Sequence, residues 1–397
     1  MHALDRAKKN VALLSACQAL LFTNNATVIA VNGLAGYALA ENKAYATLPV
    51  TGWVVGAAAT SFLASMLMKA IGRRAGFSLG ALIGIVGASL AAYAVSIGSL
   101  ALLTFATFVF GTYNAFGQFY RFAAADAAPP DFKAKAISYV LAGGLVGGLI
   151  GPKLSTFTID AFSTKFVGAY LALIVFLVLA ILVLQWLDIP RPSAAEQKEP
   201  GRPLAVIMRQ PKFIVAVVTA AFGFGVMNLL MVATPLEMTA VCGHSYDAAA
   251  LVISSHVIGM FGPSFFTGSL IKRYGVANMI VAGLVIQFIT VAIALSGVSV
   301  AHFWASLVLL GVGWNFQFIA ATTLLTEVHA PAERAKTQGA NDSLVFIVMM
   351  MTSFGSGFIL NHNGWAMLNY LSLVLTVTTL AVMIWGLRLR LAKPAQA

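Results

Sequence analysis

Apolar stretches of about 20 residues or longer recur along the whole chain, and they restrict the possible folds more than any other feature. A helix rises about 1.5 Å per residue, so about 20 apolar residues cross a hydrocarbon core roughly 30 Å thick. Twelve such stretches occur, at residues 10 to 38, 46 to 68, 76 to 97, 99 to 125, 136 to 158, 165 to 187, 213 to 236, 248 to 270, 276 to 298, 300 to 326, 337 to 360 and 364 to 387. We therefore expect an all-α membrane protein with twelve transmembrane helices.

The composition agrees with this expectation. Hydrophobic residues make up 60% of the chain and charged residues only 9%, which lies far outside the range of soluble globular proteins. The first apolar stretch has a basic flank, as a signal peptide has, but it is about twice too long for one. We expect it to remain as the first membrane helix of a protein of the bacterial cytoplasmic (inner) membrane.

The positive charges predict the orientation of the chain. With twelve spans, all but three of the 24 Lys and Arg residues fall on the side of the termini, and the exceptions are Lys43, Lys153 and Lys165. Basic loops stay in the cytoplasm, so both termini are expected there. The net charge of +11 is then explained by the topology in the lipid bilayer, and no nucleic-acid partner is needed.

The chain contains an internal duplication. A polar, proline-rich segment from Leu187 to Lys212 separates residues 1–187 from residues 213–397, with residues 188–212 as a cytoplasmic linker. Sliding the chain by 203 residues aligns Trp53 with His256, Gly56 with Gly259, and Gly72 with Gly275. A shift of 201 aligns Asn114 with Asn315 and Pro130 with Pro331. We therefore expect two related six-helix halves.

The duplicated halves and three motifs resemble the major facilitator superfamily of secondary transporters. "SMLMKAIGRRAG" from Ser65 and "GSLIKRYG" from Gly268 are similar to the family's signature loop, although Lys69 and Lys272 replace the usual aspartate. "GGLVGGLIGP" from Gly143 is similar to its glycine-rich fifth span, in which small residues allow backbones to approach closely. The resemblance implies the fold of that family and solute transport by alternating access.

Charged residues at the inner helix ends form a second candidate group. In this family such residues can pair and stabilise one state of the transporter, with Lys69 and Asp342 as the first candidate pair. Charges at helix ends can also simply anchor a span at the membrane surface. The expected conformational latch consists of Lys69, Asp126, Lys133, Lys272, Glu327, Arg334 and Asp342.

No acidic residue lies near the middle of any apolar stretch, and the polar groups at that depth are amides, one imidazole and aromatic rings. We expect the substrate cavity to use Asn24, Asn25, Trp53, Asn114, Gln118, Asn228 and Asn315. The chain shows no Ser-His-Asp arrangement, phosphate loop or pair of buried carboxylates, so an enzyme is not expected.

Two pairs of soft ligands with four-residue spacing occur in the second half. Met227 with Met231, and His256 with Met260, each share one helical face. Thioether and imidazole groups suit Cu(I). Methionine also fills gaps in apolar cores, so packing is the simpler explanation. The first half has no Met or His at the aligned positions, which favours a specific role.

These pairs resemble the paired Met and His-Met motifs of the CcoA-type copper importers, which supply copper for cytochrome oxidase assembly. The resemblance implies a metal site at Met227, Met231, His256 and Met260, with copper as the transported ion, no resident cofactor, and a copper chaperone as a further partner. Copper could first be captured at Cys242, His244 and Met238 near the outer face. The alternatives are import of riboflavin or another small solute, as in the related bacterial riboflavin importers, or drug efflux.

Overall fold

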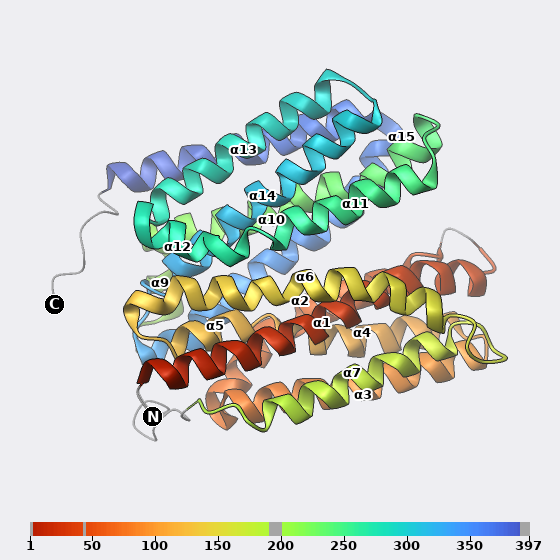
Figure 1. Ribbon diagram of the computed structural model, residues 1–397, viewed down its shortest axis with the longest axis horizontal. Helices are drawn as coiled ribbons and strands as arrows, with labels where there is room; N and C mark the ends of the chain where they lie inside the picture. The colour runs from red at the N-terminus through yellow and green to blue at the C-terminus, as the bar shows by residue number, and fades with distance from the viewer. Residues whose placement is uncertain (1–2, 43–44, 190–200, 390–397) are drawn as a thin grey trace. The chain divides into compact units, whose positions relative to one another are not determined.

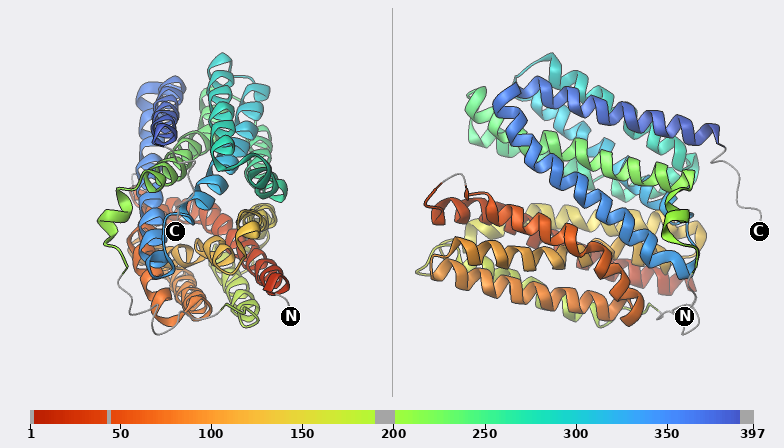
Figure 2. Two further views of the ribbon diagram at one scale, coloured as in Figure 1. Left: turned by 90° about the vertical axis from the view of Figure 1, so that its left-hand side faces the viewer. Right: turned by 180° about the vertical axis from the view of Figure 1, so that it is seen from behind.

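The computed structural model describes residues 3–42, 45–189 and 201–389, and helices dominate these ranges. Ten helices are long and apolar enough to span a membrane, and the bent pair Tyr246–Phe261 and Ser264–Tyr274 makes an eleventh. The last helix, Arg334–Arg388, has a non-helical backbone at Gly364 (φ 77°, ψ 179°) and turns back there (Figure 2). Dividing it at Gly364 gives a twelfth span, so the described residues account for the expected number.

The first of two compact units contains the described residues of Met1–Pro130, Tyr139–Glu199 and Gln338–Ser343. Its helices are labelled in Figure 1. They are α1 (Ala3–Leu39), α2 (Leu48–Ile71), α3 (Arg73–Ser96), α4 (Leu100–Gly117), α5 (Tyr120–Asp126), α6 (Lys133–Thr158), whose residues up to Ser138 belong to the other unit, and α7 (Val167–Leu184).

The second unit contains Asp131–Ser138 and the described residues of Pro200–Thr337 and Leu344–Ala397. Its helices are α9 (Leu204–Met208), α10 (Pro211–Leu236), α11 (Tyr246–Phe261), α12 (Ser264–Tyr274), α13 (Val276–Ser296), α14 (Val300–Leu325) and α15 (Arg334–Arg388). Of the expected linker, residues 190–200 lie outside the described residues.

The sequence repeat has a counterpart in backbone geometry. Gly72 ends α2 with φ 87° and ψ 161°, and Gly275 ends α12 with φ 86° and ψ 159°. A positive φ favours glycine because other residues have a Cβ that clashes there. The short 3₁₀ turn Pro130–Phe132 likewise corresponds to Pro331–Glu333, each followed directly by a long helix. The two halves thus share local turns as well as residues.

The glycine-rich face of α6 packs directly on α1. A Cβ added at Gly143 would lie 2.2 Å from the carbonyl oxygen of Ser15, and one added at Gly147 would lie 2.4 Å from that of Ala19. Neither distance leaves room for a methyl group. The expectation that small residues in this segment allow close helix approach is therefore confirmed.

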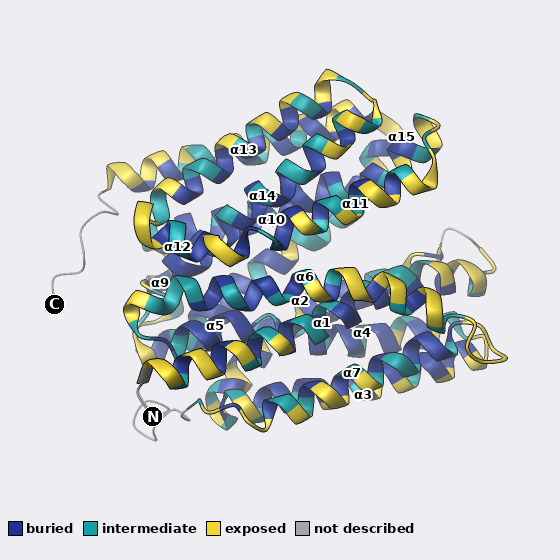
Figure 3. Cartoon of the chain, in the orientation of Figure 1, coloured by how far each residue is buried: buried dark blue, intermediate teal, exposed yellow. Residues whose placement is uncertain are grey.

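The outward faces of the helices suit a lipid environment. In each unit the exposed residues follow one side of a helix and the buried residues the other (Figure 3). Large apolar side chains such as Leu63, Val175 and Phe358 are exposed. Extensive exposed apolar surface is unusual in soluble monomers and marks contact with membrane or partner, so this pattern agrees with a multi-pass membrane protein.

Candidate functional site

A cluster of amides joins α1 and α4 in the first unit. The Nδ2 of Asn25 donates to the Oδ1 of Asn114 at 2.8 Å, and the Nε2 of Gln118 donates to the same oxygen at 3.2 Å. The Oδ1 of Asn25 is buried and has no hydrogen-bond partner among the described residues. Because a buried carbonyl oxygen normally accepts a hydrogen bond, this atom is available to a ligand.

Two further expected cavity residues lie nearby in the same unit. Asn24 is fully buried against Tyr113 of α4. Trp53, on α2, is 4% exposed, and its indole Nε1 has no hydrogen-bond partner among the described residues. Its backbone oxygen faces Gly111, where a Cβ would approach to 2.1 Å. Trp53 therefore lies at a close contact between α2 and α4.

The equivalent asparagines of the second unit tie helices together. Asn315, on α14, donates at 2.6 Å both to the carbonyl oxygen of Met260 and to the hydroxyl of Ser264, and it accepts from Thr267 at 2.7 Å. These partners surround the bend between α11 and α12. Asn315 thus holds the broken span to α14, although Gly262 and Pro263 interrupt its regular helix.

Asn228, on α10, also joins two helices of the second unit. Its amide donates to the hydroxyl of Ser353 at 2.6 Å and to the carbonyl oxygen of Met349 at 3.0 Å, both on α15. The described structure therefore uses both asparagines for contacts between helices within the second unit. Among the expected cavity residues, Asn24 and Asn25 each keep a buried side-chain oxygen that has no hydrogen-bond partner among the described residues.

The residues expected to bind copper are largely buried, and the imidazole among them is bonded to the backbone of another helix. His256 is completely buried, and its Nδ1 lies 2.6 Å from the carbonyl oxygen of Leu307 on α14. A carbonyl oxygen only accepts, so Nδ1 carries the proton and Nε2 keeps a free lone pair. Met227 and Met260 are buried, and Met231 is half-buried. Within the described residues, no three His, Cys, Asp or Glu side chains are grouped to hold a metal ion.

The residues expected to capture copper near the outer face each contact a different partner. The Nε2 of His244 lies 2.7 Å from the carbonyl oxygen of Val298, and Met238 is fully buried. The thiol of Cys242 lies 3.8 Å from the carboxylate of Glu237. Burial, and then the charge of Glu237, raises the pKa of the Cys242 thiol. This thiol therefore carries less of the thiolate form that binds metals than a free cysteine would.

The second unit also contains an aromatic cluster that was not among the predicted site residues. The Trp314 ring on α14 stacks on Phe318 at a centroid distance of 4.9 Å and an angle of 14°. Phe224 of α10 meets the Trp314 ring edge-on at 5.1 Å, and Phe261 of α11 does so at 5.9 Å. Trp314 is 1% exposed, and its Nε1 has no hydrogen-bond partner among the described residues.

A signal for this cluster is present in the sequence repeat. The shift of 201 residues that aligns Asn114 with Asn315 also aligns Tyr113 with Trp314. Both positions are buried aromatic residues on the span that carries the asparagine. An aromatic residue next to an aligned polar residue in both halves is thus a sequence signal for a candidate site position.

The charged residues at the helix ends pair differently from expectation. Asp342 bonds to Arg121 at 2.5 Å, not to Lys69, and this corrects the first candidate pair. Arg73, in the same loop motif as Lys69, bonds to Asp126 at 3.0 Å and to Gln338 at 2.5 Å. The loop thus contacts the helix that carries Asp342, but through a different cation.

The charges of the second unit also form their own pairs. Glu327 bonds to Lys212 at 2.8 Å. Lys272 lies 3.5 Å from Asp131. The backbone and side chain of Arg202 both bond to Glu333, and the side-chain contact at 2.6 Å raises the pKa of Arg202.

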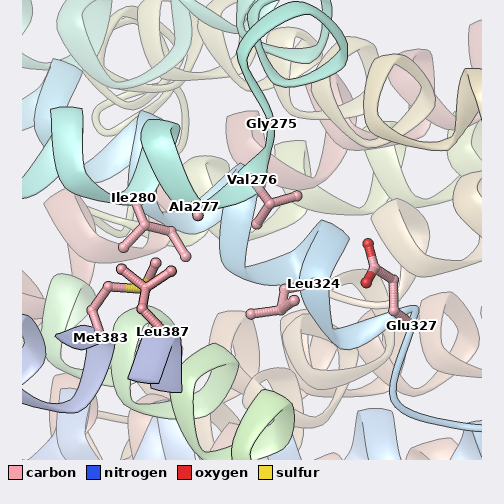
Figure 4. A pocket seen from close by; sticks show the side chains of 8 residues that line it. All are labelled: Gly275, Val276, Ala277, Ile280, Leu324, Glu327, Met383 and Leu387. Atoms are coloured by element: carbon pink, nitrogen blue, oxygen red, sulfur yellow. The ribbon is translucent and has the colours of Figure 1, made fainter. Parts of the chain in front are cut away.

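One pocket of the second unit is almost entirely apolar. It has a volume of about 230 Å³ and lies where α13 begins and where α14 and α15 end (Figure 4). Ile280, Leu324, Met383 and Leu387 line it, and Glu327 lies at one side. None of the expected cavity residues contributes to its lining, so the transported solute is not assigned to it.

Comparison with known proteins agrees with the fold and the repeat. The family model described as Major Facilitator Superfamily matches residues 13–239 and 215–397. The chain is 40% identical over 387 residues to the riboflavin transporter RfnT of Brucella anthropi, covering 96% of each chain.

Solved structures show the same architecture. The proton:xylose symporter XylE is similar with a TM-score of 0.79 and 13% identity, over 95% of this chain and 94% of that one. A variant of the fucose:proton symporter FucP of E. coli is similar with a TM-score of 0.72 and 16% identity, over 96% and 98%. The named proteins are transporters, in line with the expectation of a transporter and not an enzyme.

Proposed function

Because the chain belongs to the Major Facilitator Superfamily, we propose that this secondary transporter carries riboflavin, or a closely similar flat heterocycle, into a bacterial cell by alternating access. The observation that carries the proposal is the 40% identity, over 96% of both chains, to a riboflavin transporter. Such identity along the full length covers both halves, including the segments that hold the candidate residues. It favours the solute alternative of the sequence analysis over copper.

The aromatic cluster of the second unit supports a flat ligand. Trp314 and Phe318 stack with nearly parallel rings, and half-buried Phe224, which meets both rings edge-on, forms the accessible edge of the cluster. Aromatic rings favour offset stacking or edge-to-face contact with other rings. The isoalloxazine ring of riboflavin has the large flat surface that such contacts use, and the free Nε1 of Trp314 can donate to one of its carbonyl oxygens.

The amide cluster of the first unit, taken by itself, suits the polar groups of riboflavin. Riboflavin has alternating carbonyl and N–H groups on one ring and hydroxyl groups on its side chain. The free Oδ1 of Asn25 can accept from such a donor, while Asn114 and Gln118 hold the Asn25 amide in place. A hydrogen bond to an otherwise unsatisfied group also gives specificity, because a ligand lacking the donor leaves that group unpaired.

Copper import remains the competing hypothesis for the Met and His residues. Cu(I) as cargo, the copper chaperone as partner, and the role in cytochrome oxidase assembly stay predictions from the motif resemblance. The riboflavin proposal accounts for His256 without a metal, because the ring joins α11 to α14 through Leu307. Location in the bacterial inner membrane, with cytoplasmic termini, is part of the proposal and rests on the basic loops.

Uptake into proteoliposomes tests the proposal. Vesicles containing the purified full-length protein should exchange internal riboflavin for labelled external riboflavin. Labelled Cu(I) should not accumulate. Trp314→Leu should weaken riboflavin binding, and Trp314→Phe should retain more of it, because Phe keeps an aromatic face. Trp186→Leu is the matched control, since Trp186 is 63% exposed. Copper uptake without riboflavin exchange would overturn the proposal.

A further inference from the structure

The ion pair between Arg121 and Asp342 lies inside the first unit. Arg121 belongs to α5, Asp342 belongs to the segment Gln338–Ser343 of α15, and both side chains are 2% exposed. Each residue lies within a stretch long and apolar enough to span a membrane. Ionisable residues in such segments are rare and usually serve transport or proton movement.

Stability alone does not explain this pair. The cost of removing two charges from water often exceeds their mutual attraction, and apolar residues of similar size can replace a buried pair without loss. A leucine and a methionine would therefore satisfy packing at these positions. The presence of a carboxylate and a guanidinium points to a role that needs charge.

The hydrogen bonds of Asp342 leave one oxygen open. Its Oδ1 accepts from the guanidinium of Arg121 at 2.5 Å and from the amide of Asn341 at 2.8 Å. Its Oδ2 is buried and has no hydrogen-bond partner among the described residues. All identified donors therefore converge on one oxygen, and the other has free lone pairs where a proton can bind.

A second charged pair lies beside the first. The guanidinium of Arg73, on α3, bonds to Asp126 of α5 at 3.0 Å and to Gln338 at 2.5 Å. Gln338 precedes Asp342 by one helical turn, so both face the same side of α15. The α2 helix packs on Gly339 through Phe62 and Ser65 and carries Lys69 one turn further along.

This arrangement links the protonation of Asp342 to the exposure of the segment Gln338–Ser343 to water. Arg73 and Arg121 balance Asp126 and Asp342 while all four are ionised, and Lys69 adds a further cation on α2. A proton on Asp342 would remove the negative charge that lies 2.5 Å from the buried guanidinium of Arg121. Such a state is costly in a low-dielectric interior and becomes favourable once water reaches Arg121. Proton binding should therefore accompany opening of this region, and proton release its closing.

We propose that the Oδ2 of Asp342 is the proton-binding site that couples solute transport to proton movement. In the binding step, hydronium transfers a proton to an Oδ2 lone pair, an O–H bond forms, and water is released. The carboxylate becomes neutral while Arg121 keeps its charge. The reverse step returns the proton to water on the other side of the membrane. The coupling rests on the proposed transporter function, but the proton site itself can be tested without riboflavin.

Infrared difference spectroscopy tests the site directly. The purified full-length protein in lipid vesicles is titrated with acid, and the carbonyl stretch of a protonated carboxyl group is recorded. One such band should be missing in Asp342→Asn and present in Asp160→Asn, an exposed control. If Asp342→Asn fails to fold because the buried negative charge beside Arg121 is lost, the double variant Arg121→Gln, Asp342→Asn removes both charges. An unchanged set of bands in the folded variant would overturn the proposal.

Transport in proteoliposomes tests the coupling. A pH gradient should drive accumulation of riboflavin by the wild-type protein and by Asp160→Asn. Asp342→Asn, or the double variant, should lose this accumulation but retain exchange of riboflavin at equal pH. If riboflavin transport by the wild-type protein does not respond to the pH gradient, the proposed coupling is wrong. Absence of any wild-type exchange would instead overturn the riboflavin proposal, and the infrared titration would still decide whether Asp342 binds the proton.

Discussion

The imidazole of His256 is bonded to the backbone of Leu307, with Nδ1 2.6 Å from the carbonyl oxygen. This bond joins α11 to α14. The backbone of His256 also lies against α14, because a Cβ added at Gly311 would come within 2.7 Å of its carbonyl oxygen. In the first half, Trp53 has the same relation to Gly111. The position of the His-x-x-x-Met motif is thus a helix contact that both halves share.

Replacement of His256 should therefore lower stability. His256→Ala removes one buried hydrogen bond, which contributes about 1 kcal/mol, and leaves a cavity that adds to the loss. The thermal unfolding temperature of the purified protein should fall in the presence and in the absence of copper. A copper-dependent stabilisation of the wild type that is lost in His256→Ala would contradict a purely structural role and support the metal site.

The methionines offer a second distinction between packing and metal binding. Met→Leu changes volume little and usually costs less than about 1.5 kcal/mol in a core. We expect Met227→Leu and Met231→Leu, singly and together, to keep wild-type riboflavin uptake at normal protein levels. Met227→Ala should be more harmful, because Met227 is buried and alanine leaves a cavity. If both leucine variants abolish transport while folding survives, the thioethers act as ligands.

Close helix packing at glycine gives a third prediction. In Gly111→Ala the new methyl group would lie 2.1 Å from the carbonyl oxygen of Trp53, so α2 and α4 must separate. Overpacking of this kind typically costs about 1 to 3 kcal/mol. Gly357→Ala is the matched control, because no atom lies within 4 Å of the added methyl. Thermal unfolding in detergent should show a clear loss for Gly111→Ala only, and equal unfolding temperatures would contradict this packing.

The sequence predicted the spans and the duplication well, for simple physical reasons. The length of an apolar stretch is set by the thickness of the bilayer, and aligned turns such as Gly72 and Gly275 require the same backbone geometry in both halves. The interruption of span eight between α11 and α12 was less evident. It depends on Asn315, a residue of another helix, to satisfy the polar groups of the bend.

The side-chain pairs were harder to predict. Spacing along the chain shows that Asp126 and Lys133 lie near one helix end, but the orientation of each helix decides which cation reaches the carboxylate. In the structure Arg73 reaches Asp126, from a helix distant in sequence. Arg121 was overlooked, although an arginine inside an apolar stretch is itself a signal of function. Its partner Asp342 was identified only as a charge near a helix end.

The thiol of Cys242 provides the last prediction, which concerns pH. Cys242 follows the π-helical turn Glu237–Val241, and its raised pKa is caused first by burial and then by Glu237. Since the thiolate is the reactive form, alkylation by iodoacetamide should be slower than that of a free cysteine at the same pH and should rise at higher pH. Glu237→Gln removes the negative charge beside the thiol, so it should lower the pKa of Cys242 and speed alkylation near neutral pH.

Asp247→Asn is the control, because Asp247 is exposed and close in sequence. The thiol of Cys17 is buried, so we expect iodoacetamide not to reach it. Equal rates for wild type and Glu237→Gln across the titration would show that Glu237 does not act on this thiol.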